Sequence, residues 1–270
     1  MSDASELAGQ AFPPTGVDDT VPHSARWWNY LQGGKHWYPV DREAAEAFIE
    51  QVPELGDLAM SSREFLWRTV RWAAGEAGIR QFLDLGAGLP AEPNVHELAQ
   101  RQDPSARVVY LDNDAMVTLQ RHAYLTCTPE GATAYLDADM RDTARVLREA
   151  GRTLDFDQPL ALIFSDVLGH INNDNQALTL VRQLVDSVAP GSYLILSHSA
   201  PSPRLSAAAA AYAETGGIPY RLRPIDQIAQ FFDGLEMIDP GLVPMPEWRP
   251  DATTRPTRED VGYGAVARIP

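Results

Sequence analysis

Apolar segments and amphipathic segments alternate along the chain from residue 80 to its end. Short apolar runs typical of buried strands cover 81–85, 107–111, 133–136, 160–164 and 193–196, and two further strands are expected at 235–238 and 262–268. Apolar positions at helical spacing lie between and after them, at 93–102, 115–125, 143–149, 176–188, 206–214 and 225–232. This alternation predicts an α/β fold with a mostly parallel sheet, which binds ligands at the carboxyl ends of its strands.

The part of the chain before residue 79 follows a different pattern. Residues 1–20 are rich in Pro, Gly and Asp and predict a flexible arm. Amphipathic helices are expected at 41–52 and 62–77, with Ser61 or Ser62 as the N-cap of the second helix. A helical unit is therefore expected to precede the sheet.

A segment rich in aromatic residues lies just before these helices. Between residues 26 and 38, several Trp and Tyr residues surround the pair Gly33 and Gly34. We predict a short helix and a glycine hinge that form a lid over the ligand-binding edge of the sheet. The predicted organisation is an arm at 1–20, an N-terminal helical lid at 21–78 and a ligand-binding domain at 79–270.

Composition and charge narrow the class of function. The formal net charge is −15, and the basic residues form no cluster that could displace counterions from nucleic-acid phosphates. No apolar run approaches the ~20 residues of a membrane span, and the N-terminus lacks the pattern of a secretory signal. A single cysteine, Cys127, suits a reducing compartment. We expect a cytoplasmic protein that acts on a small molecule, without nucleic-acid or membrane partners; a homodimer is compatible with the sequence.

The end of the first predicted strand carries the main motif. Asp84 lies two residues before Gly86, and Gly88 follows in the same turn. The glycines let the backbone approach a ligand closely, and the carboxylate suits a cationic group. The α-ammonium of S-adenosylmethionine (SAM) is such a group.

Polar residues at the next strand ends extend this candidate cofactor site. Asp112 ends the second predicted strand, where a carboxylate can accept both ribose hydroxyls, and Asn113 follows it. Asp139 and Met140 follow the third strand and suit the exocyclic amine and the ring of adenine. Ser165 ends the fourth strand and completes the set.

A dinucleotide is the main rival ligand. Gly86, Gly88 and Ala91 fit the loose G-x-G-x-x-G/A fingerprint of NAD-binding proteins. Asp84 and Pro90 favour SAM instead, as do the residues after the third strand, because a pyrophosphate at a helix start gains nothing from a nearby acid. In a purely structural interpretation, the acidic residues only cap turns.

A set of longer motifs resembles one particular family. The motifs are Arg26 to Lys35, Asp41-Arg42, Gly78 to Asp84, Asn94 to Glu97, Val109 to Asp114, Pro190 to Leu194, Ser197-His198 and Trp248 to Pro250. They resemble an actinobacterial family of SAM-dependent methyltransferase-like proteins, long catalogued as a domain of unknown function, and the likeness covers nearly all of residues 22–270. It implies a class I methyltransferase fold, with a Rossmann-like seven-stranded sheet, helices on both faces and SAM as cofactor. It implies no substrate.

The loop after the fourth predicted strand departs from the family pattern, in which a pair of histidines is usual. Gly169 replaces one polar ring before His170, and Asp166 lies in the same loop. The resemblance places this loop opposite the transferred methyl group. A roomier or differently polarised substrate pocket is therefore expected.

Three residues are candidate general bases, which methyl transfer needs only if the acceptor must lose a proton. His170 follows the fourth strand, Asp166 precedes it in the same loop, and His198 ends the fifth strand. Correct alignment of the acceptor can supply most of the acceleration without a base. Each of the three can instead be a hydrogen-bonded structural residue or a cap.

The lid supplies the remaining candidates. Aromatic rings can hold a sulfonium by cation–π attraction or simply pack the helices on the sheet. Basic groups there can contact a carboxylate or remain solvated. The predicted cofactor contacts from the lid are Tyr30, Gly34 and Lys35, and the predicted substrate contacts are Arg26, Trp27, Trp37 and Tyr38.

The sequence favours a SAM-dependent methyltransferase that modifies an oxygen or nitrogen of a small molecule, for example in natural-product (secondary) metabolism. Three alternatives stay open at this point. The site can serve another SAM-dependent chemistry such as cyclisation or elimination, the chain can be a non-catalytic SAM-binding protein, or it can be an NAD-linked oxidoreductase.

Overall fold

A computed structural model of the chain describes residues 17–90, 92–114, 116–117, 119–120, 126–252, 254–255 and 262–270. Its centre is one mixed sheet in the order β3-β2-β1-β4-β5-β8-β6, with β7 paired to β8. The strands are β1 (Gln81–Leu85), β2 (Arg107–Asp112), β3 (Ala132–Asp137), β4 (Ala161–Ser165), β5 (Tyr193–Ser199), β6 (Glu236–Met237), β7 (Val243–Pro244) and β8 (Gly262–Arg268).

The first five strands are parallel, and β8 enters the sheet antiparallel to β5. This confirms the predicted α/β class and all seven predicted strands. The sheet has eight strands rather than seven because Val243 and Pro244 pair with Gly264 and Tyr263 at one end of β8. A two-residue edge strand of this kind is too short to leave an alternating pattern in the sequence.

The helices are α1 (Ser24–Leu31), α2 (Pro39–Gln51), α3 (Leu55–Gly75), α4 (Val95–Gln102), α6 (Thr143–Ala150), α7 (Asp174–Val185), α8 (Pro203–Glu214) and α9 (Ile225–Ala229). A 3-10 turn, Gln230–Phe232, continues α9. The predicted helix at 115–125 falls largely outside the described residues. The other predicted helices are present, with bounds that differ by a few residues in most cases.

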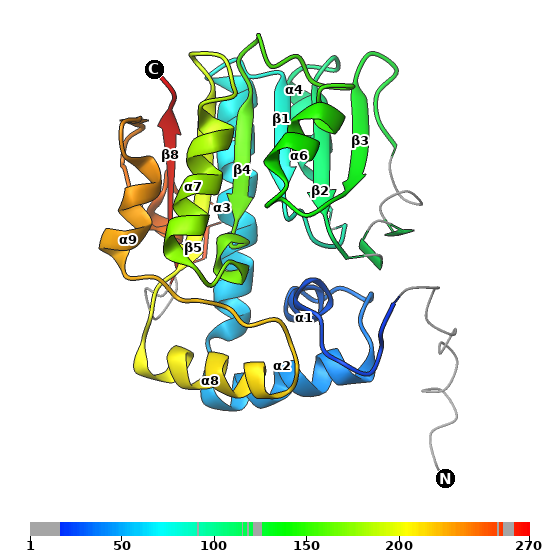
Figure 1. Ribbon diagram of the computed structural model, residues 1–270, viewed down its shortest axis with the longest axis vertical. Helices are drawn as coiled ribbons and strands as arrows, with labels where there is room; N and C mark the ends of the chain where they lie inside the picture. Colours follow the sequence, from blue (N-terminus) through cyan, green and yellow to red (C-terminus); the bar gives the residue numbers. More distant parts are fainter. Residues whose placement is uncertain are drawn as a thin grey trace.

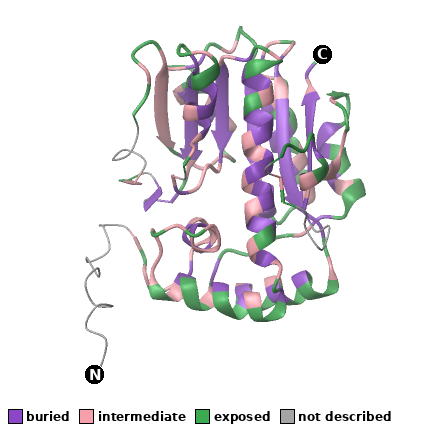
Figure 2. Ribbon diagram, turned by 180° about the vertical axis from the view of Figure 1, so that it is seen from behind, coloured by how far each residue is buried: buried purple, intermediate pink, exposed green. Residues whose placement is uncertain are grey.

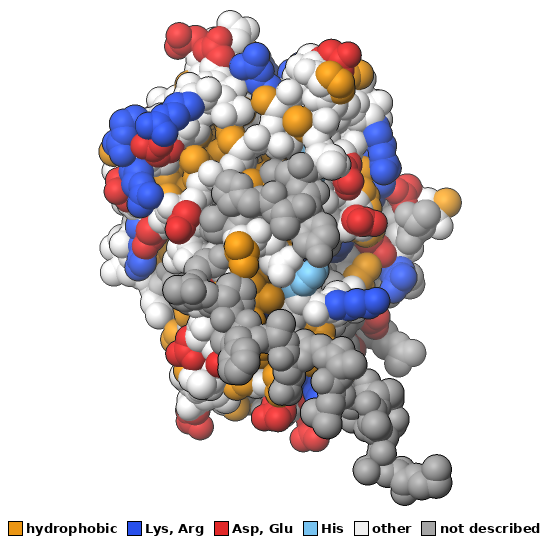
Figure 3. All heavy atoms as spheres, turned by 90° about the vertical axis from the view of Figure 1, so that its right-hand side faces the viewer, with side chains coloured by type: hydrophobic (Ala, Val, Ile, Leu, Met, Phe, Trp, Pro, Cys, Tyr) orange, Lys and Arg blue, Asp and Glu red, His pale blue; other side chains and the backbone are white. Residues whose placement is uncertain are grey.

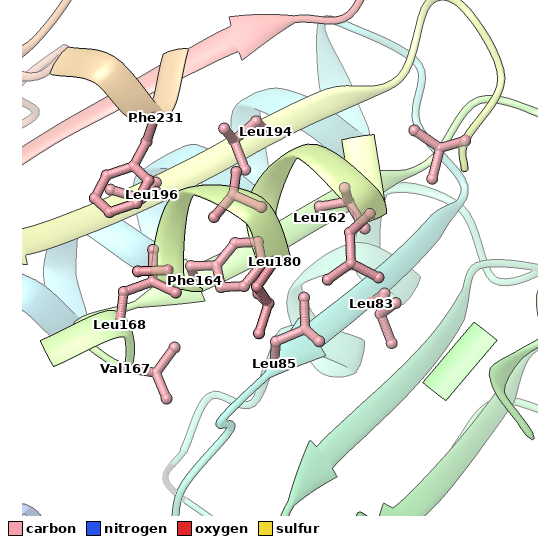
Figure 4. Packing of buried hydrophobic residues seen from close by; sticks show 14 of the residues in the cluster. Leu83, Leu85, Leu162, Phe164, Val167, Leu168, Leu180, Leu194, Leu196 and Phe231 are labelled. Atoms are coloured by element: carbon pink, nitrogen blue, oxygen red, sulfur yellow. The ribbon is translucent and has the colours of Figure 1, made fainter. Parts of the chain in front are cut away.

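The sheet is covered on both faces, because side chains of successive strand residues point to opposite sides. Phe82 and Ile163 lie in one hydrophobic layer with α3 and α4. Leu83 and Leu162 lie in the other, with α6, α7 and α9. Figure 4 shows part of this second layer, where strand residues gather beside Leu180 of α7. The strands are thus fixed from both sides, which holds their carboxyl ends in place.

Helix α3 begins seven residues earlier than predicted. Glu54 is the residue before its first turn, so Ser61 and Ser62 lie in the helix interior and neither caps it. The N-cap prediction was wrong because Leu55 and Leu58 continue the helical spacing upstream of the serines. Ser62 consequently points its hydroxyl into the protein, where it takes part in the site described below.

Helices α1, α2 and α8 lie beneath the carboxyl ends of the parallel strands (Figure 1). Their inner sides are buried and their outer sides exposed, as Figure 2 shows for the lower layer. Of the predicted lid, α1 and α2 occupy this place, whereas most of α3 runs along the sheet. Helix α8, from the last third of the chain, packs on α2 and completes the layer. Of the predicted arm at 1–20, residues 1–16 lie outside the described residues.

On the face shown in Figure 3, basic side chains lie in separate groups with acidic side chains close to them. Over the described ranges, no helix combines the length and the apolar character that crossing a membrane requires.

Candidate functional site

A cavity of about 320 Å³ lies between the strand ends and the layer of α1, α2 and α8. Its upper end is formed by polar and glycine residues of the strand ends, namely Asp84, Gly86, Gly88, Asp112, Asn113, Asp139, Met140 and Ser165. Its lower end is apolar and aromatic, and includes Trp27, Trp28, Phe48, Leu55, Leu58, Leu66, Leu205, Tyr212, Ile218 and Leu222. The cavity therefore joins two compartments of different chemistry.

The glycine turn after β1 forms one wall of the polar compartment. Gly86 and Gly88 have φ values of +72° and +61°, which side chains with a Cβ rarely adopt. A Cβ at Gly86 would overlap Val167, whereas one at Gly88 would meet nothing within 4 Å. The backbone at Gly88 therefore borders open space, so a ligand can approach it closely.

Asp112 holds this turn against the end of β2. Its carboxylate accepts hydrogen bonds from the amides of Gly88 (2.8 Å) and Asp114 (3.0 Å) while it lines the cavity. Asp84 lies in β1 beside it and is 3% exposed. Both predicted carboxylates thus line the same cavity, because β1 and β2 are parallel neighbours.

Asp139 follows β3 and lines the same polar compartment. Arg141 donates to both of its carboxylate oxygens, at 2.9 Å from Nε to each. The hydrogen bond from Arg141 lowers the pKa of Asp139, so this carboxylate is ionised at neutral pH. Met140 lies next to it along the cavity wall.

His23 contacts Asp114 at the edge of this compartment, and the sequence pattern did not predict this contact. Its Nδ1 lies 2.7 Å from Oδ2 of Asp114, and His23 also lines the cavity. Burial alone would raise the pKa of Asp114, but the bond from His23 and the amides of Met116 and Val117 outweigh it and lower the pKa. The segment before α1 is thereby tied to the loop after β2.

A buried carboxylate lies where the two compartments meet. Asp166 is 8% exposed and has a φ of +53°. It accepts hydrogen bonds from four hydroxyl groups, those of Ser62 (2.6 Å), Ser197 (3.1 Å), Ser199 (3.2 Å) and Tyr220 (3.2 Å). Sequence analysis identified Asp166 but missed these four donors, which come from α3, β5 and the segment after α8.

The two candidate histidines occupy different places. His170 lines the cavity, its ring meets that of Tyr220 edge to face, and its Nδ1 is buried without a partner among the described residues. Burial lowers the pKa of His170 to about 4. His198 does not line the cavity: Nδ1 donates to the Ser199 carbonyl and Nε2 accepts from Arg223. Burial lowers the pKa of His198 to about 3.

His198 is therefore corrected from a candidate base to a structural residue. Both of its ring nitrogens are occupied, and the side chain is fully buried away from the cavity. Its position at the end of β5 was predicted, but the direction of its side chain depends on Arg223, whose guanidinium fills the space beside it.

Of the predicted lid contacts, Trp27 lines the cavity, together with Trp28 and Phe48 from the same N-terminal region. The other predicted lid contacts do not line it, and each has a different environment. The Tyr30 hydroxyl donates to Glu46, and Trp37 Nε1 donates to the Gly34 carbonyl. Lys35 is exposed.

Arg26 and Tyr38 also lie outside the cavity lining. The Arg26 guanidinium, 2% exposed, pairs with Asp41 and lies over the ring of Tyr38. It also donates to the carbonyls of Asp18 and Val21. Arg26 therefore organises the segment before α1 and does not line the predicted substrate pocket.

Gly169 makes room for Tyr220 and not for a larger substrate. A Cβ at Gly169 would overlap the ring of Tyr220, whose hydroxyl donates to Asp166. The expected roomier pocket is thus filled by a tyrosine that comes from 51 positions further along the chain.

Replacing Gly169 by alanine is expected to lower the free energy of unfolding by about 1–3 kcal/mol, because the added methyl group overpacks a filled site. Chemical denaturation measures the change. Gly56→Ala is the matched control, since a Cβ there meets nothing within 4 Å and alanine favours the helix. Equal effects of the two substitutions would contradict the tight packing of Tyr220 on Gly169.

Comparisons with known proteins agree with this architecture. A family model described as S-adenosyl methyltransferase matches residues 10–270. A DUF574 family protein from Streptomyces avermitilis superposes with a TM-score of 0.90 at 41% identity, over 94% of this chain and 99% of that chain. A candidate methyltransferase from Thermobifida fusca gives a TM-score of 0.86 at 34% identity, over 96% of this chain and 98% of that chain.

A more distant structure shares the fold alone. An O-methyltransferase family protein from Burkholderia thailandensis has a TM-score of 0.50 at 15% identity, over 80% of this chain and 57% of that chain. No curated protein matches the chain. The family model and the two similar structures confirm the family predicted from the motifs, with its class I methyltransferase fold and with SAM as cofactor. The chain belongs to the S-adenosyl methyltransferase family.

Proposed function

We propose that the protein methylates an oxygen or nitrogen atom of a small, largely apolar molecule, as an enzyme of natural-product metabolism. The observation that carries this proposal is the single cavity that joins the acidic strand ends to an aromatic compartment under α1, α2 and α8. A polar cofactor and an apolar acceptor can meet in such a cavity. The lone thiol, Cys127, supports a cytoplasmic location.

The residues of the polar compartment suit SAM, which when bound supplies a methyl group on a positively charged sulfur. Asp84 is assigned to the α-ammonium group, and Asp112 with Asn113 to the ribose. Asp139 and Met140 are assigned to adenine. The open backbone at Gly88 and the cavity-lining Ser165 complete the wall around the cofactor.

The apolar compartment has two tasks in the proposed reaction. Trp27 stacks on Trp28 and contacts Phe48 edge to face, which fixes the three rings relative to one another. A fixed apolar wall excludes water and aligns the acceptor, and alignment alone can supply a large part of the rate acceleration. Tyr212 from α8 adjoins Trp27 and extends this wall.

Asp166 is assigned as the group that takes the acceptor proton. It lies between the compartments and is held by its four hydroxyl donors. His170, with a pKa of about 4, is neutral at pH 7 and a weaker base than an ordinary histidine. We assign it to positioning Tyr220, against which its ring packs.

Asp112→Ala is expected to weaken SAM binding about ten- to a hundredfold, since a charge-assisted hydrogen bond contributes about 1.5–3 kcal/mol. Thermal unfolding with and without SAM, S-adenosylhomocysteine and NAD measures this. A ligand at 100 times its Kd contributes about 2.7 kcal/mol and should raise the Tm of the natural protein by about 5–10 °C.

Each variant is compared with its own ligand-free Tm, because Asp112 also accepts two amide hydrogen bonds. Asp137→Ala is the control: Asp137 faces Asp112 in the sheet register but is exposed and does not line the cavity. A Tm increase with NAD alone, or an undiminished increase with SAM in Asp112→Ala, would contradict the assignment.

A further inference from the structure

The hydroxyl groups around Asp166 make an unusual surface between the two compartments. A carboxylate offers only acceptor positions, so each hydroxyl that contacts it must use its hydrogen as the donor. Ser62 and Ser197 donate to Oδ2, and Ser199 and Tyr220 donate to Oδ1. The hydrogens of all four hydroxyl groups therefore point at Asp166. Ser62, Ser199 and Tyr220 line the cavity and Ser197 does not, and the Tyr220 oxygen already accepts from the Ser199 amide at 3.3 Å. What Ser62 and Ser199 can still offer to a ligand is oxygen lone pairs.

The negative charge behind these lone pairs is not neutralised by a basic side chain. Within the described ranges, no Arg, Lys or His forms an ion pair with Asp166. The two arginines that line the cavity have other partners: Arg141 pairs with Asp139, and Arg63 donates to Gln32. The surface that faces an acceptor is thus both anionic and composed of hydrogen-bond acceptors.

From this surface we infer that the methyl acceptor is a primary or secondary amine, cationic in solution, on an apolar body. The inference rests on the proposed function and specifies that the methylated atom is nitrogen and not oxygen. An ammonium group has donors and no lone pairs, so it matches an acceptor-only surface at every position. An alcohol brings lone pairs that find no donor there, and a carboxylate is repelled by Asp166.

The aromatic compartment supports the same class of acceptor. Trp27, Trp28 and Tyr212 line the cavity on the side away from the strand ends. Faces of aromatic rings attract cations, and large aromatic side chains also bury a hydrocarbon body. Burial keeps Tyr212 neutral by raising its pKa, so this wall adds no negative charge that would need a further partner.

The proposed methyl transfer needs only the amine, SAM and the groups around Asp166. The ammonium gives one proton to the oxygen of a serine hydroxyl that donates to Asp166, and this hydroxyl passes its own proton to Asp166, which becomes a neutral carboxylic acid. The freed nitrogen lone pair forms a bond to the methyl carbon, while the carbon–sulfur bond breaks and its electron pair stays on sulfur. Asp166 then returns its proton to solvent, and the product leaves as an N-methylated ammonium ion together with S-adenosylhomocysteine.

Three compounds that share a naphthalene ring and differ in their polar group test the inference: 2-naphthylmethylamine, 2-naphthylmethanol and 2-naphthoic acid. Each is titrated by calorimetry into protein saturated with S-adenosylhomocysteine. We expect the amine to bind at least tenfold more tightly than the alcohol, and the acid not to bind. Incubation with SAM should convert the amine to a product heavier by one CH₂, detected by mass spectrometry.

The variant Asp166→Asn keeps the shape of the side chain and removes its charge. The preference for the amine over the alcohol should fall below about threefold, while S-adenosylhomocysteine still stabilises the variant as it does the natural protein. Ser61→Ala is the matched control, because Ser61 is the buried neighbour of Ser62 and its hydroxyl has no partner in the described part of the chain. It should leave the preference unchanged.

Equal or tighter binding of the alcohol or the acid would overturn the inference. So would a preference that persists in Asp166→Asn, or the absence of binding by all three probes to a protein that S-adenosylhomocysteine stabilises. A protein that S-adenosylhomocysteine does not stabilise would instead contradict the proposed function itself, so the two failures are distinguishable.

Discussion

Replacing Arg26 by methionine is expected to lower the free energy of unfolding by about 3–5 kcal/mol, because the change leaves a buried carboxylate without its cation. Arg26 is 2% exposed and Asp41 is fully buried. The carboxylate of Asp41 also accepts from the amides of His23 and Tyr38, both at 2.8 Å. One buried ion pair therefore fixes the start of α1, the start of α2 and the segment before them.

Urea denaturation of the ligand-free protein measures this loss. Arg42→Met is the matched control, because Arg42 pairs with Glu46 at 3.8 Å on the exposed side of α2. An exposed pair at this spacing contributes about 0.3–0.5 kcal/mol. If both variants lost the same small amount, the Arg26 pair would not be the element that holds the N-terminal segment.

The same substitution has a functional consequence. Trp27 and Trp28 follow Arg26 directly and form part of the aromatic compartment. Misplacing α1 should therefore weaken binding of the apolar acceptor more than binding of SAM, whose assigned residues lie on the strand ends. Arg26 was predicted to contact the substrate; in the structure it pairs with Asp41 and holds the helix whose Trp27 and Trp28 line the cavity.

The polar compartment was predictable because it depends on strand ends alone. Asp84, Asp112 and Asp139 lie far apart in the sequence, but parallel strands bring their carboxyl ends to the same edge of the sheet. A strand pattern and the residue that follows it are local properties. They are therefore readable without knowledge of the three-dimensional contacts.

The apolar compartment was not predictable in the same way. An amphipathic pattern shows which face of α8 is buried, but not that this face lies under the sheet beside α2. Ser62 and Asp166 are 104 positions apart, and only the path of α3 brings them to 2.6 Å. Tyr220 lies in a segment without periodicity, so nothing local indicated that its ring would fill the space beside Gly169.

In the predicted lid too, the local sequence predicted the place of some side chains and not of others. The aromatic content of 26–38 predicted a helix near the cavity, and Trp27 and Trp28 confirm it. Tyr30 and Trp37 instead pack edge to face on each other, at 5.2 Å between ring centroids. Side-chain direction on so short a helix is decided by its rotation about its axis, which the surrounding helices set and the local sequence does not.

Lowering the pH from 7 to 5 is expected to cost roughly 2 kcal/mol of unfolding free energy for each of the two buried histidines. The pKa values of His170 and His198 are lowered to about 4 and about 3, mainly by burial. In the unfolded chain a histidine titrates near 6.5. Between these values the unfolded state binds protons that the folded state does not, so stability falls as the pH falls.

The window from pH 6.5 to 5 isolates the histidines, because the carboxylates with lowered pKa, such as Asp114 and Asp139, titrate below it. Urea midpoints and slopes are measured across this window for the natural protein, for His170→Gln and for His198→Gln. Each variant should lose about half of the pH dependence, while the curves stay parallel above pH 7. An unchanged dependence in both variants would show that these rings take up protons in the folded protein as readily as in the unfolded chain. Arg223 could then not donate to His198 at pH 5 as it does here.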